Sequence, residues 1–373
     1  MREETSRAWR EVDLNALAHN ARVLQGALAP GCRLMSVVKA DAYGHGSIPV
    51  ARRLEAEGVK AFAVACLEEG IALRQSGVQG KILILGYTPP GMAFQICRWK
   101  LVQTVVDEDH GRALAAQGVP LSVHLALDTG MHRLGIPAED HKALQHLYEL
   151  PNLNIEGVFS HLCVSDSLEA EDMSFTCTQL ERFYATVRWL KTHGMNPGEI
   201  HIQASYGIWN LPPQPCSWAR AGIALYGIFS NDAHTERKLD LHPVLSLRAR
   251  VALVRTMLPG EGAGYGLAFR TDQMRRLAVV TVGYADGLPR SLSQQGGEVL
   301  LHGTRCSMVG RMCMDQLMVD VTDVPCVRPG DVATIIGIDG GEVIRAEDVA
   351  GQCGTITNEL LSRLGQRLPI VAD

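Results

Sequence analysis

Short apolar runs alternate with amphipathic, helix-like stretches up to about residue 230. Seven runs rich in β-branched residues indicate strands, at residues 34–40, 61–65, 81–85, 103–106, 122–127, 155–161 and 200–205. Regular alternation of this kind predicts parallel strands joined by helical crossovers. An eighth strand, expected at 221–229, would close a barrel with its active site at the carboxyl ends of the strands. The alternative, an open doubly wound sheet, is disfavoured because no GxGxxG follows the first strand.

Three helical patterns carry boundary signals. Asp13 is the expected N-cap of a helix whose apolar residues recur every three to four positions. A second helix is expected from Ser47 to Gly58, and a third is expected to open near Pro137.

The pattern changes near residue 243. Strand-like runs separated by turns follow, with one late helix expected at roughly 345–363. We therefore predict an α/β chain with an N-terminal (β/α)8 TIM-like barrel over residues 12–243. A mainly antiparallel β domain would cover residues 244–373, and residues 1–11 would join it.

Composition excludes several classes of protein. The formal charge is −5 and no basic run occurs, which argues against nucleic acid or an anionic membrane as a partner. The ten cysteines form no CxxC pair, so we expect reduced thiols and no metal site. No stretch approaches the roughly 20 apolar residues of a membrane helix, and the charged N-terminus lacks the apolar core of a signal peptide. We expect a cytoplasmic chain, or the cytosolic domain of a longer membrane protein.

Lys39 ends an apolar, β-branched run and is followed by Tyr43 in the sequence VVKADAYGHG. One interpretation is a lysine that leaves the core and extends into solvent. The other is a partly desolvated amine that has lost its charge and bonds to an aldehyde cofactor, because only the neutral amine is nucleophilic.

Eight motifs, in one order along the chain, resemble those of the alanine racemase family of fold type III enzymes that use pyridoxal 5'-phosphate (PLP). They are VVKADAYGHG (37–46), LDTGMHRLG (127–135), EGVFSHL (156–162), RAGIALYG (220–227), GAGYGLAFR (262–270), VGYADGLPR (282–290), VGRMCMDQLMVDVTD (309–323) and TNELLSRLGQRLPIV (357–371). The resemblance spans nearly the whole chain. It implies a homodimeric, PLP-dependent isomerase with the barrel and β domain described above.

The resemblance also implies seven cofactor-binding residues. Lys39 would bond to PLP, Arg220 would face the pyridine nitrogen and His161 would pack against the ring. The phosphate contacts would come from Tyr43, Ser205, Gly222 and Ile223. Because a guanidinium stays protonated, Arg220 would leave the ring nitrogen neutral, which favours proton exchange over transamination.

Racemisation needs an acid–base group on each face of the substrate, and the resemblance implies Lys39 for one face and Tyr265 for the other. Tyr265 would reach the site from the second subunit of the dimer. A phenol loses its proton readily at neutral pH only beside positive charge, which Arg133 would supply while helping to hold the substrate carboxylate. The site entrance would be lined by Met314, Asp315 and Tyr284.

Three positions depart from the family pattern. Ala126 stands where many members carry a lysine modified to a carbamate, and Ala204 replaces the asparagine before the phosphate-binding serine. Asn358 stands in place of the tyrosine of a Tyr-Glu pair that reaches the substrate pocket. A smaller amide side chain leaves room and hydrogen-bonding groups for a hydroxymethyl substituent. In this respect the chain resembles the racemase domain of VanT-type serine racemases of vancomycin-resistant bacteria.

The sequence therefore predicts interconversion of L- and D-serine with residual alanine racemase activity, supplying D-serine for modified peptidoglycan precursors in vancomycin resistance. The main alternative is a biosynthetic alanine racemase that supplies D-alanine for the cell wall. Two others are a barrel-type PLP decarboxylase of basic amino acids and a PLP-carrying storage or regulatory protein. The β domain that carries Tyr265 argues against the storage protein, since such binders are lone barrels.

Overall fold

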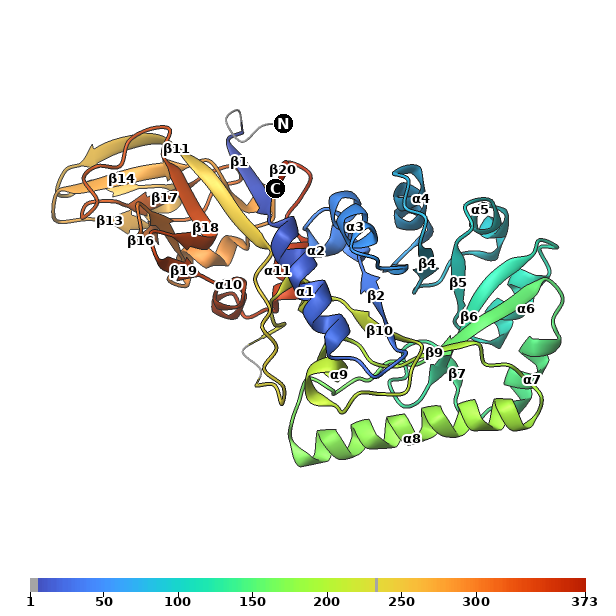
Figure 1. Ribbon diagram of the computed structural model, residues 1–373. Coiled ribbons are helices and arrows are strands. Elements are labelled where there is room, and N and C mark those ends of the chain that lie inside the picture. Colours follow the sequence, from blue (N-terminus) through green and yellow to red (C-terminus); the bar gives the residue numbers. More distant parts are fainter. Residues whose placement is uncertain (1–5, 232–233) are drawn as a thin grey trace.

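The computed structural model describes residues 6–231 and 234–373, and it has two domains (Figure 1). Residues 1–5 of the segment expected to join the β domain lie outside the described residues. A barrel is built from the first part of the chain and a β domain from the last part, with strand β1 of the N-terminus placed in the β domain. One cluster of buried apolar side chains includes residues of both domains, so they share a continuous core.

Eight parallel strands form the barrel wall in the order β10-β2-β3-β4-β5-β6-β8-β9. Their bounds are β2 Arg33–Val37, β3 Ala61–Val64, β4 Lys81–Ile84, β5 Val102–Val105, β6 Leu121–Asp128, β8 Leu153–Phe159, β9 Glu199–His201 and β10 Trp218–Ala221, and the short β7 (Ile136–Pro137) pairs with β6. The wall closes between β9 and β10, where the Ser217 amide donates to the Ile200 carbonyl at 2.8 Å and the Arg220 amide donates to the Gln203 carbonyl at 3.0 Å. The predicted barrel is confirmed.

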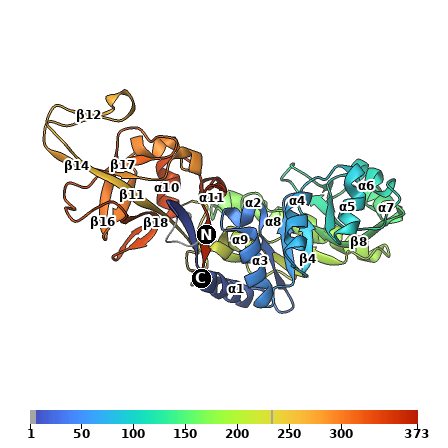
Figure 2. The same ribbon diagram turned by 90° about the horizontal axis from the view of Figure 1, so that it is seen from above.

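Helices follow the strands and cover the outside of the barrel (Figure 2). They are α1 Leu14–Gly26, α2 Lys39–Tyr43, α3 Ser47–Ala56, α4 Leu67–Gln75, α5 Ala93–Arg98, α6 Glu108–Ala115, α7 His141–Glu149, α8 Ala170–Thr192 and α9 Ser205–Asn210, with 3₁₀ turns η2 Pro90–Met92 and η3 Ile223–Tyr226. The predicted cap of α1 is confirmed, because the Asp13 carboxylate accepts from the amides of Asn15 and Ala16, each at 2.8 Å.

Three sequence predictions were wrong in detail. The eighth strand is Trp218–Ala221 rather than 221–229, since residues 223–226 form the turn η3. All residues from 218 to 226 are buried. A continuous stretch of buried residues does not by itself distinguish a strand from a buried turn. The third helix begins at His141, where Asp140 caps it, and Pro137 lies in β7. The late helix is two helices, α10 (Ala346–Gln352) and α11 (Thr357–Ser362), separated by Gly354 at φ +66°.

The β domain is one strongly curved sheet in the order β19-β18-β15-β16-β17-β14-β11-β1-β20, and β18 pairs with β11 as well. Its strands are β1 Ala8–Val12, β11 Leu245–Met257, β14 Arg275–Val280, β15 Glu298–Leu301, β16 Thr304–Val309, β17 Leu317–Asp320, β18 Val332–Asp339, β19 Glu342–Ile344 and β20 Ile370–Ala372. The pairings are antiparallel except for β1 with β20, as predicted. A separate hairpin joins β12 (Gly262–Ala263) to β13 (Phe269–Arg270), and 3₁₀ turns lie at η4 Tyr265–Leu267, η5 Tyr284–Asp286 and η6 Arg290–Gln294. Within the described residues, no helix has the length and apolar character needed to cross a bilayer.

Candidate active site

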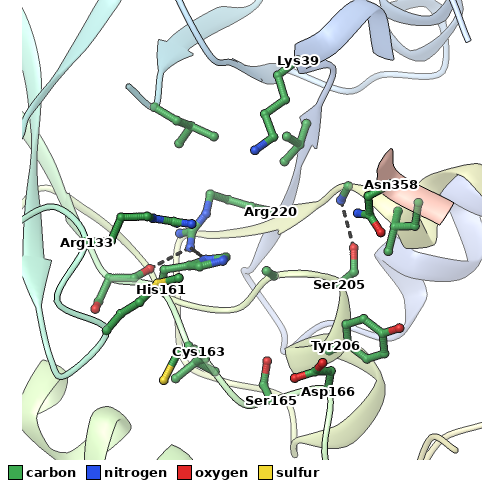
Figure 3. A pocket seen from close by; sticks show the side chains of 18 of the residues that line it. Lys39, Arg133, His161, Cys163, Ser165, Asp166, Ser205, Tyr206, Arg220 and Asn358 are labelled. Atoms are coloured by element: carbon green, nitrogen blue, oxygen red, sulfur yellow. Dashed lines mark hydrogen bonds between the residues drawn. The ribbon is translucent and has the colours of Figure 1, made fainter. Parts of the chain in front are cut away.

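A cavity of about 550 Å³ opens at the carboxyl ends of the barrel strands (Figure 3). Nine of the residues predicted from the sequence line it, and they are Lys39, Tyr43, Arg133, His161, Ser205, Arg220, Gly222, Ile223 and Asn358. Most of them follow or end barrel strands, which explains why the topology brings distant segments together. Asn358 comes instead from α11, beyond the strands of the β domain, so both domains contribute to the cavity wall.

Lys39 is positioned by an unusual turn. The four residues from Ala40 to Tyr43 all have φ between 53° and 54°, a left-handed conformation that costs about 1–2 kcal/mol per residue for non-glycine residues. Buried Arg10 helps to hold the turn, since its guanidinium donates to the Gly44 carbonyl at 2.6 Å. Glu69 holds the other side by accepting from the Ala40 amide at 2.7 Å. The local strain is therefore balanced by contacts from two other segments and places the lysine amine and the Tyr43 ring in one cavity.

The electrostatic surroundings of Lys39 favour the neutral amine. Burial lowers its pKa from the ordinary value, and the positive charge of Arg133 lowers it further. Glu69 acts in the opposite direction, and Arg220 adds to the lowering. A lysine with a lowered pKa is a better nucleophile and base at neutral pH than an exposed one.

A polar corner lies at one end of the cavity. The Ser205 hydroxyl accepts from the amides of Gly222 at 3.0 Å and Ala224 at 3.2 Å. The Tyr43 hydroxyl reaches the same place, because a Cβ added to Gly222 would lie 2.6 Å from the Tyr43 oxygen. Hydroxyls and backbone amides at the rim of a barrel suit a phosphate group. Burial raises the pKa of Tyr43 to about 12, so its hydroxyl remains a donor at neutral pH.

Arg220 occupies the middle of the cavity floor and is buried. Its guanidinium donates to the Ser160 carbonyl at 2.7 Å, to His201 Nδ1 at 2.6 Å and to His161 Nδ1 at 3.2 Å. Burial lowers its pKa to about 10, which still leaves it charged at neutral pH. Burial, followed by the charges of Arg220 and Arg133, lowers the pKa of His161 to about 3, so this histidine is neutral.

Two buried histidines extend from Arg220 through the barrel interior. A guanidinium only donates, so His201 must accept at Nδ1 and carry its proton on Nε2. That Nε2–H then donates to His124 Nδ1 at 2.9 Å, and His124 carries its own proton on Nε2, which lies 3.8 Å from the Glu199 carboxylate. The Arg220 guanidinium, the charged donor at one end of this series of hydrogen bonds, therefore fixes the tautomers of both rings.

Arg133 and Asn358 are among the polar cavity side chains for which the described part of the chain offers no partner. Within the described residues, the Arg133 guanidinium has no hydrogen bond or ion pair. Ala126 lines the same cavity, at the position where many members of the family carry a lysine. The Asn358 Oδ1 atom is buried and accepts no hydrogen bond within the same residues. An unsatisfied buried oxygen costs about 1–3 kcal/mol, so Asn358 Oδ1 is suited to accept a hydrogen bond from a ligand. The exposed Arg133 guanidinium is suited to bind an anionic group.

Four predicted residues lie elsewhere. Tyr265 is 65% exposed on the β12–β13 hairpin, which extends from the end of the β domain far from the barrel (Figure 2). Met314, Asp315 and Tyr284 also lie on the β domain, where the Ala285 amide donates to the Met314 carbonyl at 2.9 Å. A single chain therefore does not bring these four residues to the cavity that contains Lys39.

Sequence reasoning missed several residues of the cavity wall. Cys163, Ser165 and Asp166 follow the end of β8 and line the cavity, as do Asp128 at the end of β6 and Tyr206 after β9. Their position just after predicted strands was the available signal, because carboxyl ends of barrel strands meet at one rim. His124 and His201 gave no such signal, since they lie within strands.

Comparison with known proteins places this geometry in a family. The sequence pattern described as "Alanine racemase, N-terminal domain" matches residues 12–230, and the one described as "Alanine racemase, C-terminal domain" matches residues 244–372. The chain belongs to the alanine racemase family. An "Amino-acid racemase" of Enterococcus faecalis is 44% identical over 99% of this chain and 52% of its own length. A "Serine/alanine racemase" of Enterococcus gallinarum is 39% identical over 97% of the chain and 51% of its own length.

Solved structures of the family share the fold. The alanine racemase of Clostridium difficile 630 has a TM-score of 0.92 and is 32% identical, with 99% of this chain and 96% of that chain covered. The chain spans about half the length of the two enterococcal relatives.

The alanine racemase family uses PLP, and the residues of the cavity fit this cofactor. The Lys39 amine, the polar corner at Ser205 and the charged Arg220 guanidinium all line the same cavity. Glycine at position 222 leaves the space beside Tyr43 that any side chain would fill. Ile223 also lines the cavity, although the amides that bond to Ser205 are those of Gly222 and Ala224.

Proposed function

We propose that this chain is a PLP-dependent amino-acid racemase that interconverts L- and D-serine and retains alanine racemase activity. One observation carries the proposal. A lysine with a lowered pKa and a buried, unpartnered amide oxygen of Asn358 line the same cavity. The finer assignment is that the D-serine produced enters modified peptidoglycan precursors in vancomycin resistance.

Seven residues would hold the cofactor. Lys39 would carry it, and the phosphate would lie against Tyr43, Ser205, Gly222 and Ile223. Arg220 would face the ring nitrogen, and His161 would lie against the ring. When bound, PLP supplies an electron sink that allows a proton to leave the α-carbon of an amino acid. The protonated Arg220, fixed by its buried acceptors, keeps that sink weak and so limits side reactions.

Two residues would move protons. The Lys39 Nζ atom holds or accepts a proton on one face of the substrate, aided by the burial that favours its neutral form. The Tyr265 hydroxyl serves the opposite face and comes from a second copy of the chain. Arg133, which has no partner among the described residues, is free to bind the substrate carboxylate and to favour the phenolate.

The location of Tyr265 supports a homodimer. It lies on the hairpin farthest from the barrel of its own chain, and other large apolar side chains of the β domain are also exposed. These include Leu258, Leu267, Met274 and Met314, each about half exposed or more. An exposed apolar group of this kind marks an interaction surface. We assign Met314, Asp315 and Tyr284 to the entrance of the partner's site.

Asn358 is the proposed determinant of the substrate. Its unpaired Oδ1 can accept a hydrogen bond from a serine hydroxyl, whereas an alanine methyl group leaves it unsatisfied. One hydrogen bond contributes about 1 kcal/mol net, which corresponds to about a fivefold preference. Alanine remains a substrate, because a site that gains one hydrogen bond does not exclude the smaller side chain.

The test is turnover of L-serine and L-alanine by the purified wild type and by Asn358→Tyr. We expect the serine-to-alanine ratio of kcat/KM to fall about fivefold or more in the variant. An unchanged ratio would show that Asn358 does not select the substrate. A wild type that prefers alanine would favour the alternative of an alanine racemase, which the likeness to alanine racemase structures supports.

Two measurements test the chemistry itself. Borohydride trapping followed by peptide mapping should place the cofactor on Lys39, and a label on another lysine would overturn the assignment. Tyr265→Phe should lose racemisation and keep the cofactor absorbance. If turnover persists in this variant, Tyr265 is not the second base. Release of carbon dioxide from a basic amino acid would point instead to a decarboxylase.

A further inference from the structure

A cysteine, a histidine and an aspartate form a linear group on the β domain, away from the cavity. His302 lies in the turn between β15 and β16, while Cys326 and Asp331 lie in the loop between β17 and β18. The Cys326 Sγ atom is 3.1 Å from His302 Nδ1, and His302 Nε2 is 2.9 Å from the Asp331 carboxylate. None of the three lines the cavity that contains Lys39.

The proton positions in this group follow from its ends. The Asp331 carboxylate also accepts from the Arg328 amide at 2.9 Å, and the Arg328 guanidinium lies 3.6 Å from its other oxygen. An ionised carboxylate only accepts, so a neutral His302 carries its proton on Nε2. Its Nδ1 lone pair then accepts a hydrogen bond from the Cys326 thiol. This is the order nucleophile, base and orienting carboxylate, in which a thiol can be activated.

The backbone holds the three side chains in place. His302 has φ +52°, a left-handed conformation that costs about 1–3 kcal/mol outside glycine and is kept by its neighbours. The next amide, that of Gly303, donates to the Asp339 carboxylate at 3.1 Å. Asp331 is fixed to β11, because the Val251 amide donates to its carbonyl at 2.8 Å. The arrangement therefore does not depend on the side-chain hydrogen bonds alone.

The other thiols provide a contrast. Of the ten cysteines, only Cys177 and Cys326 are exposed. Cys177 lies on α8, and within the described residues its thiol has no hydrogen-bond partner. Burial raises the pKa of Cys32 to about 12 and that of Cys306 to about 11, which suppresses their thiolates. Cys326 alone combines exposure with a base and a carboxylate behind that base.

We propose that Cys326 is a modification site that undergoes exchange with small disulfides, with His302 as the proton acceptor and Asp331 as a positioning residue. The thiol proton passes to His302 Nδ1, and the Cys326 sulfur attacks one sulfur of the disulfide. The old sulfur–sulfur bond breaks, and the leaving thiolate takes up a proton, so a mixed disulfide forms without another oxidant. The exposed positive charge of Arg328 would favour an anionic disulfide.

The probe is 5,5'-dithiobis(2-nitrobenzoate), whose coloured thiolate product reports the rate, followed by peptide mapping of the full chain. We expect Cys326 to react at least about tenfold faster than Cys177 in the same molecule. His302→Gly should bring the two rates together without backbone strain, because glycine adopts a positive φ freely. Added imidazole should restore part of the Cys326 rate, which a purely structural effect would not do.

Asp331→Asn tests the positioning role. Because the Arg328 amide donates to the same Asp331 oxygen that accepts from His302 Nε2, an asparagine would keep its oxygen in that place and would remove only the negative charge that stabilises a protonated His302. The Cys326 rate should fall severalfold, while the Cys177 rate and the thermal midpoint stay near the wild-type values. Equal rates for the two cysteines in the wild type, or no rescue of His302→Gly by imidazole, would overturn the proposal.

Discussion

Replacing His201 with phenylalanine should destabilise the barrel through Arg220. The His201 ring is buried and stacks on Phe159, with ring centroids 4.8 Å apart and planes 3° from parallel. Phenylalanine keeps this stack and nearly the same volume. It removes the Nδ1 atom that accepts from the Arg220 guanidinium at 2.6 Å and the donor to His124 Nδ1 at 2.9 Å.

The magnitude follows from what is left unpaired. A buried donor without its acceptor costs about 1–3 kcal/mol, and a charged donor lies toward the upper end of that range. The same Arg220 nitrogen keeps a second acceptor, the His201 carbonyl at 3.2 Å, which softens the loss. Adding the unsatisfied His124 acceptor, we expect the free energy of unfolding to fall by about 3 kcal/mol.

The assay is urea unfolding of the protein without PLP, followed by circular dichroism and by tryptophan fluorescence to test whether the transition is two-state. His193→Phe is the matched control, because His193 is exposed and also stacks on a neighbouring ring. Its effect should stay within about 0.5 kcal/mol. Equal stability of the two variants, or a His201 proton on Nδ1 in nitrogen NMR of the wild type, would contradict this role of His201.

Three other substitutions or conditions test separate parts of the structure. Gly222→Ala should weaken PLP binding about tenfold in an absorbance titration, because the new methyl group would lie 2.6 Å from the Tyr43 hydroxyl; unchanged affinity would contradict the phosphate assignment. Gly44→Ala should destabilise the protein by more than about 3 kcal/mol in urea, since φ is +81° and the added carbon would lie 2.1 Å from the Leu361 carbonyl oxygen; a loss below 1 kcal/mol would be too small for this clash. Burial lowers the pKa of His45 to about 4, against about 6.5 in the unfolded chain. The contribution of the neutral, buried His45 to the free energy of unfolding is therefore full above pH 6.5 and is lost progressively as the pH falls toward 4. Urea unfolding at a series of pH values should show this decline, and a flat profile across that window would refute it.

Local sequence determined the architecture of the barrel. The alternation of apolar runs and amphipathic stretches sufficed to place seven strands, and Asp13 marked the start of α1, because both signals depend on residues within a few positions of one another. The same rule explains the failures. Residues 223–226 and Pro137 were assigned wrongly because burial and proline are each compatible with more than one local structure.

Tertiary structure decided the polar network. The sequence indicated Lys39 and Asn358 as chemically significant, but only the packing of α11 against the barrel rim put both on one cavity and left Asn358 Oδ1 without a partner. The chain from Arg220 through His201 to His124 depends on the registers of separate strands, and the contact between Cys326 and His302 joins residues from two loops. Pairing between distant segments is set by the whole sheet rather than by neighbouring residues, and so no short stretch of sequence contains it.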